Sequence, residues 1–99
     1  MKSLDMEKIE EYLYKEVFFI VDELFKNLKL NNIDVELEKN DLTEKETEAY
    51  INIYNEYRDK LVSLKENVLK EYGYINNFDY IFAIIIQNVV DKKKSENYN

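Results

Sequence analysis

Apolar residues recur every three or four positions over two long stretches of the chain, and this spacing is typical of helices. The first stripe runs through residues 9–28, and Phe18 and Phe19 widen it until its middle is apolar nearly all round. A helix of this kind packs against more than one neighbour. We therefore expect a helix over 4–30, with Ser3 as its N-cap.

The second stripe has the spacing of a heptad repeat, with steps of four and three residues that alternate along the seam. Its members are Tyr50, Tyr54, Tyr57, Leu61, Leu64 and Val68. Thr43 and Glu46 have the spacing of a capping box, which marks a helix start. Gly73, the only glycine of the chain, is typical of the position just after a helix. The pattern predicts a helix over 43–72.

A third apolar segment has a less regular pattern. Residues 80–86 have high strand propensity and no clear period, so a strand is one interpretation. The length of the segment, Asn76 before it and the lysines at 92–94 after it favour a buried helix over 77–93. We expect 95–99 to form a frayed tail.

Between the first two segments lies an acidic stretch whose apolar and acidic residues alternate over 33–38. This is the period of a strand, but no partner strand is evident. We interpret 31–42 as an extended acidic linker laid against the helices, with a short strand paired to a second chain as the alternative. The predicted fold class is all-α, a three-helix antiparallel bundle that forms one domain over 1–94.

The predicted helices differ in length, and this difference leaves one end of the bundle open. The first two helices would each be about 40 Å long, but the third only about 25 Å. We expect the uncovered side chains to contact a partner protein or a second copy of the chain, unless the linker covers them. This predicted interface comprises Leu24, Phe25, Leu28, Tyr50, Tyr54 and Tyr57.

Negative charge is concentrated beside that end. The formal net charge is −7, and residues 34–48 hold seven acidic residues against two lysines. Either this stretch is only a solvated linker and helix start, or it forms a surface that engages a basic partner. The predicted acidic surface comprises Asp34, Glu36, Glu38, Asp41, Glu44 and Glu48.

The composition excludes several kinds of chemistry. The chain has no His and no Cys, which excludes a disulfide, a thiolate nucleophile, an imidazole base and a typical zinc site. With a single glycine it has no glycine-rich phosphate loop. We expect no cofactor, no metal and no enzymatic activity. One Arg and a single basic cluster at 92–94 argue against a direct nucleic-acid ligand.

The apolar runs are too short to span a membrane, and acidic residues near the N-terminus do not fit a signal peptide. We therefore expect a cytoplasmic protein without a membrane partner. High contents of Lys, Asn, Ile and Tyr with little Ala are typical of coding in an AT-rich genome. This composition points to a low-GC bacterium, or to a phage or plasmid within one.

These features favour a small acidic protein-binding module, regulatory or inhibitory, that forms a homodimer and occupies a basic surface on a larger protein, such as a nucleic-acid-binding protein. In size and charge the chain resembles phage-encoded inhibitors of host nucleases. One alternative is a self-associating structural or assembly subunit. A second is a bacteriocin-immunity-like helical bundle, which the chain resembles in size and helix content.

Overall fold

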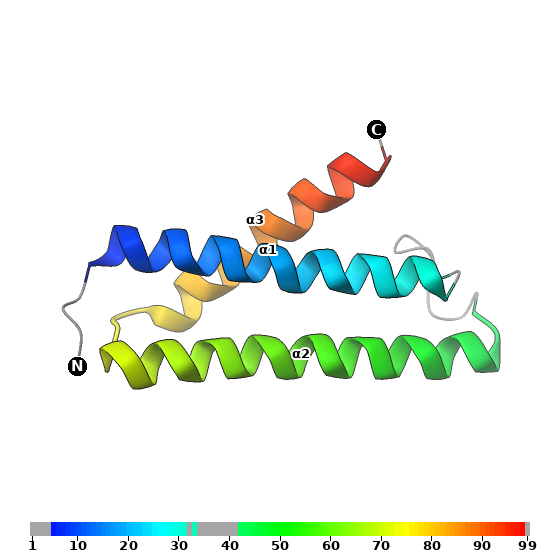
Figure 1. Ribbon diagram of the computed structural model, residues 1–99, viewed down its shortest axis with the longest axis horizontal. Helices are drawn as coiled ribbons and strands as arrows, with labels where there is room; N and C mark the ends of the chain where they lie inside the picture. Colours follow the sequence, from blue (N-terminus) through cyan, green and yellow to red (C-terminus); the bar gives the residue numbers. More distant parts are fainter. Residues whose placement is uncertain (1–4, 32, 34–41, 99) are drawn as a thin grey trace.

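The computed structural model describes residues 5–31, 33 and 42–98, and its regular structure is entirely helical (Figure 1). The helices are α1 (Met6–Leu30), α2 (Glu44–Tyr72) and α3 (Phe78–Tyr98). The predicted all-α, three-helix fold is confirmed. Residues 80–86 belong to α3, so the helical interpretation of this segment is correct and the strand is excluded.

Both ends of α2 are set by the local chemistry that the sequence predicted. The Thr43 hydroxyl accepts a hydrogen bond from the Glu46 backbone N–H at 3.1 Å, and the Glu46 carboxylate accepts one from the Thr43 N–H at 3.0 Å. This second bond lowers the pKa of Glu46 because it favours the charged form. At the other end Gly73 has φ 80° and donates its N–H to the Leu69 carbonyl. Positive φ suits glycine because it has no Cβ.

The ends of the other two helices differ from the predictions. Helix α1 begins at Met6, and Asp5 is its N-cap, accepting a hydrogen bond from the Lys8 N–H; Ser3 lies outside the described residues. Helix α3 continues to Tyr98, so the predicted frayed tail at 95–99 is wrong as far as that residue. No glycine or proline interrupts the chain after the lysines, and nothing there stops the helix from propagating.

Helices α2 and α3 both pack against α1. Helix α2 runs antiparallel beside it, whereas α3 crosses it obliquely and diverges from the first half of α2 (Figure 1). The Lys93 ammonium lies 2.6 Å from the Asp22 carboxylate and 4.6 Å from the centre of the Phe18 ring. The hydrogen bond from Lys93 lowers the pKa of Asp22. Asn88 donates to the Tyr14 hydroxyl at 2.9 Å. These contacts anchor the second half of α3 to α1.

The core explains why the pattern over 80–86 is irregular. One face of α3 is buried, and its buried residues are Phe78, Phe82, Ile85 and Val89. Tyr80 and Ile84 are apolar too, but they lie on the opposite, exposed face. Apolar residues on both faces hide the helical period in the sequence. Among the described residues every buried side chain is hydrophobic.

Candidate functional site

The structure buries half of the predicted interface. Leu24, Phe25 and Leu28 are 4%, 9% and 0% exposed, so the prediction that they are uncovered is wrong. Partly buried side chains of the first half of α2 pack against the core cluster to which these three residues belong. Ile33 is also buried, and its N–H donates to the Leu28 carbonyl at 2.8 Å. These three residues are therefore buried within the single chain, in a core to which Ile33 also belongs.

The three tyrosines of the predicted interface form a ladder on α2. Tyr50 and Tyr54 have ring centres 4.5 Å apart, and Tyr57 meets Tyr54 edge to face at 5.9 Å. All three are half-buried against the core. Burial, reinforced by Tyr50, raises the pKa of Tyr54 to about 12, and burial also raises that of Tyr57. This tyrosine ladder keeps part of its surface exposed, which suits a contact surface.

The raised pKa of Tyr54 has a consequence for stability at high pH. An unfolded tyrosine ionises near pH 10, so the neutral Tyr54 stabilises the fold fully below that pH. This contribution is lost as the pH rises from 10 through about 12. We expect the free energy of unfolding, measured by urea titration, to fall over this range. Tyr54→Phe should reduce the fall, and Tyr74→Phe, at an exposed position, should not.

The predicted acidic surface is described only at its C-terminal side. Glu44 and Glu48 are exposed near the start of α2. Asp34, Glu36, Glu38 and Asp41 lie outside the described residues. Glu44 and Glu46 occupy the first turn of α2, where negative charge stabilises the helix dipole. The acids at this helix start therefore have a structural role, which leaves a role in binding as a prediction.

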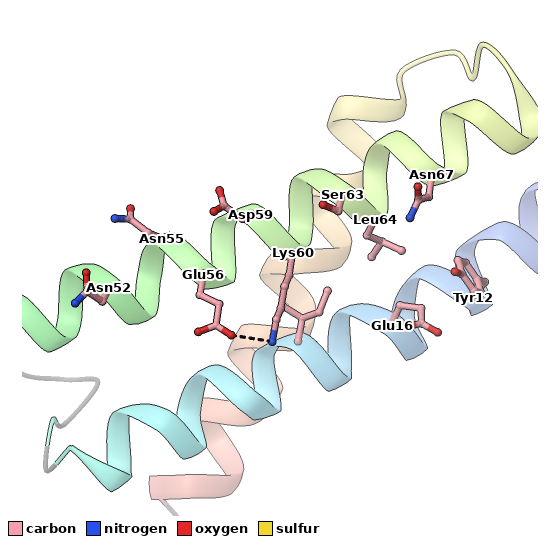
Figure 2. Close-up of a pocket in the computed structure, with 11 residues that line it drawn as sticks. Tyr12, Glu16, Asn52, Asn55, Glu56, Asp59, Lys60, Ser63, Leu64 and Asn67 are labelled. Carbon is pink, nitrogen blue, oxygen red and sulfur yellow. Dashed lines mark ion pairs between the residues drawn. The ribbon is translucent and has the colours of Figure 1, made fainter.

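A second candidate surface is an open groove between α1 and α2 (Figure 2). We call it the α1–α2 groove, and it has a volume of about 640 Å³. Its lining residues are Tyr12, Glu16, Ile20, Asn52, Asn55, Glu56, Asp59, Lys60, Ser63, Leu64 and Asn67. The groove was not predicted from the sequence because its two walls are far apart in the chain. The available signal was the run of polar residues at helical spacing in the second helix.

The two walls of the groove differ in character. On the α2 wall five polar residues follow one another at steps of three or four positions: Asn52, Glu56, Asp59, Ser63 and Asn67. The α1 wall contributes an aromatic ring, a carboxylate and an aliphatic side chain from Tyr12, Glu16 and Ile20. Figure 2 shows Glu56 and Lys60 close together on the side of α2 that faces α1. The groove thus has a polar rim and a partly apolar floor.

Ion pairing leaves the groove acidic. The Lys60 ammonium bridges the helices, at 2.7 Å from the Glu23 carboxylate of α1 and 3.3 Å from that of Glu56. The hydrogen bond to Glu23 raises the pKa of Lys60, which keeps this side chain charged and engaged. Glu16 and Asp59 form no ion pair with any residue in the described ranges. Their carboxylates are therefore available to a cationic ligand.

The described part of the chain contains no group of three or more acidic residues that could hold a metal ion. None of its helices is long and apolar enough to cross a membrane. The groove instead offers carboxylate, amide and hydroxyl groups to a polar ligand. Such an arrangement can bind by charge and hydrogen bonding.

Comparisons with protein-family models, with curated proteins and with solved structures find no match to this chain. The charge, shape and exposed side chains of the surface are therefore the basis for a functional proposal.

Proposed function

We propose that the chain is a small acidic protein-binding module that regulates or inhibits a larger protein by occupying a basic surface on it. The observation that carries this proposal is the open, acidic α1–α2 groove, in which three carboxylates accompany a single lysine. With a net charge of −7, the protein attracts basic partners at long range and speeds their association. The proposal assigns it no enzymatic activity.

The burial pattern supports a binding role. The polar side chains of the described residues are all at least partly exposed, so their charge and hydrogen-bonding groups are placed where a partner can reach them. The groove is wide and open, whereas small-molecule sites usually enclose most of their ligand. Recognition of another protein's surface suits this geometry better.

A second candidate function is self-association as a homodimer, alone or together with partner binding. Large apolar side chains are exposed on all three helices, among them Phe19 of α1 at 56%, Val62 of α2 at 47% and Tyr80 of α3 at 69%. The tyrosine ladder adds partly exposed aromatic rings. Homodimers are the commonest protein assemblies, and their interfaces are rich in such residues.

The solution mass tests self-association. The chain has a mass of 12.0 kDa, so a homodimer is expected to scatter as about 24 kDa. Because an apolar interface depends little on ionic strength, we expect the same mass at low and at high salt. Light scattering in both buffers measures this. A mass near 12 kDa in both buffers would show a monomer and would contradict the homodimer.

The partner-binding function requires a different experiment. The tagged protein is cross-linked in cells that produce it, the captured protein is purified, and its affinity is measured over a salt series. We expect a partner with a basic surface and an affinity that falls steeply as salt screens the charges. An acidic partner, or a salt-independent affinity, would contradict the proposal.

A further inference from the structure

We infer that the α1–α2 groove binds an extended, Lys- or Arg-containing segment of the partner protein. This inference rests on the proposed function and specifies both its binding site and the chemistry of the bound segment. It is carried by the dimensions of the groove, its amide groups and its unpaired carboxylates.

The length and spacing of the α2 wall match an extended chain. Its polar residues cover 52–67, about 22 Å along the helix axis. An extended segment of about seven residues has the same length. Steps of three or four helical residues rise roughly 4.5–6 Å, somewhat less than the roughly 6.6 Å that separates alternate residues of an extended chain. Every second residue of the segment would therefore face the groove.

The amide groups on this wall favour an extended backbone over a helix. Asn52, Asn55 and Asn67 are exposed, and none forms a side-chain hydrogen bond with another residue in the described ranges. Each amide carries an acceptor and donors that can pair with a backbone N–H and C=O. An extended segment presents these groups, whereas a helix has already paired most of its own.

The charges and the floor of the groove favour basic side chains. Glu16 lines the groove from α1, and Asp59 lies at its outer rim on α2, turned away from α1 in Figure 2; neither carboxylate forms an ion pair within the described ranges. Lys60 adds little repulsion because Glu23 and Glu56 neutralise it. Lys and Arg carry long aliphatic stems that can cover apolar surface while their charged ends reach acids. Ile20, Leu64 and the Tyr12 ring supply that surface.

The groove is accessible from the side shown in Figure 2. The view looks onto the groove, and α3 passes behind α1 and α2. The α3 helix, including Lys93 at its anchor on Asp22, therefore does not occupy the site. A segment from another protein can approach α1 and α2 without displacing any part of α3.

Titration of the ¹⁵N-labelled protein with a nine-residue peptide of alternating Lys and Thr, followed by NMR, tests this inference. We expect saturable shifts of the Asn52, Asn55 and Asn67 side-chain amides. Combining Glu16→Gln with Asp59→Asn should weaken binding about tenfold, because charge-assisted contacts are lost. Glu11→Gln, the same change at an exposed position of α1 outside the groove, should have little effect.

A second peptide tests recognition of the backbone. When every second residue is N-methylated, the peptide lacks the backbone N–H donors at those residues, so it should bind about tenfold more weakly.

Each other result has a distinct meaning. Shifts confined to the surroundings of Glu44 and Glu48 would overturn the groove as the site but leave the proposed function intact. Equal affinity for the N-methylated peptide would overturn recognition of an extended backbone. If the peptide fails to bind while a captured partner binds with steep salt dependence, only the inference about the groove is wrong. If neither binds, the proposed function is wrong as well.

Discussion

Replacing Ile85 with aspartate is expected to abolish folding. Ile85 is 2% exposed and lies in the middle of the buried face of α3. An unpaired charge at such a site costs several kcal/mol, which is comparable with the roughly 5–15 kcal/mol by which a whole domain is stable. Far-UV circular dichroism should show loss of most of the helical signal.

The neighbouring position provides the matched control. Ile84 has the same side chain on the same helix but is 40% exposed, so Ile84→Asp should leave the helical signal intact. A folded, soluble Ile85→Asp variant with a native spectrum would mean that α3 is not central to the core.

Leu28→Ala is expected to lower the free energy of unfolding by about 2–5 kcal/mol, the usual cost of a cavity in a packed core. The side chain is 0% exposed within a single chain, so the loss should be the same at low and high protein concentration. Urea unfolding at two concentrations a hundredfold apart measures this. Leu30→Ala, two residues on and 80% exposed, should change the stability by less than about 0.5 kcal/mol.

The comparison of two protein concentrations distinguishes burial of Leu28 within one chain from its burial at the predicted interface between two chains. If Leu28 contacted a second copy of the chain, its truncation would matter more at high concentration, where the assembly forms. A loss of stability that grows with concentration would therefore contradict the burial of Leu28 within the single chain.

Features that depend on neighbouring residues in the chain were predictable from the sequence. The capping box of Thr43 and Glu46 and the positive φ of Gly73 fix α2 within a few residues of each end. The regular stripe of α1 likewise identified its buried side, because one helical period determines which residues share a face. Even α3, with its apolar residues on both faces, was recognised as a helix, although the lysines at 92–94 that were predicted to end it lie within it.

Features that depend on contacts between distant segments were not predictable in this way. Helix lengths alone suggested that Leu24, Phe25 and Leu28 are open, but coverage depends on how α2 and Ile33 pack in three dimensions. The oblique crossing of α3 on α1 brings together Lys93 and Asp22, which are 71 residues apart in the chain. The α1–α2 groove likewise forms only when two separate helices meet. The run of polar residues in the second helix marks one wall of the groove, but no local pattern shows which segments meet.

The buried residues are distributed unevenly among the helices, and this affects which positions can change in evolution. Helix α1 contributes seven buried residues, and α2 only two, Leu64 and Val68. Substitutions in α1 therefore risk loss of the fold, whereas most positions of α2 can change at small cost. Because the polar wall of the groove belongs to α2, selection could alter the proposed binding surface while the scaffold persists. We expect amino-acid substitutions in descendants of this sequence to accumulate at the exposed polar positions of α2 and to remain rare at the buried positions of α1.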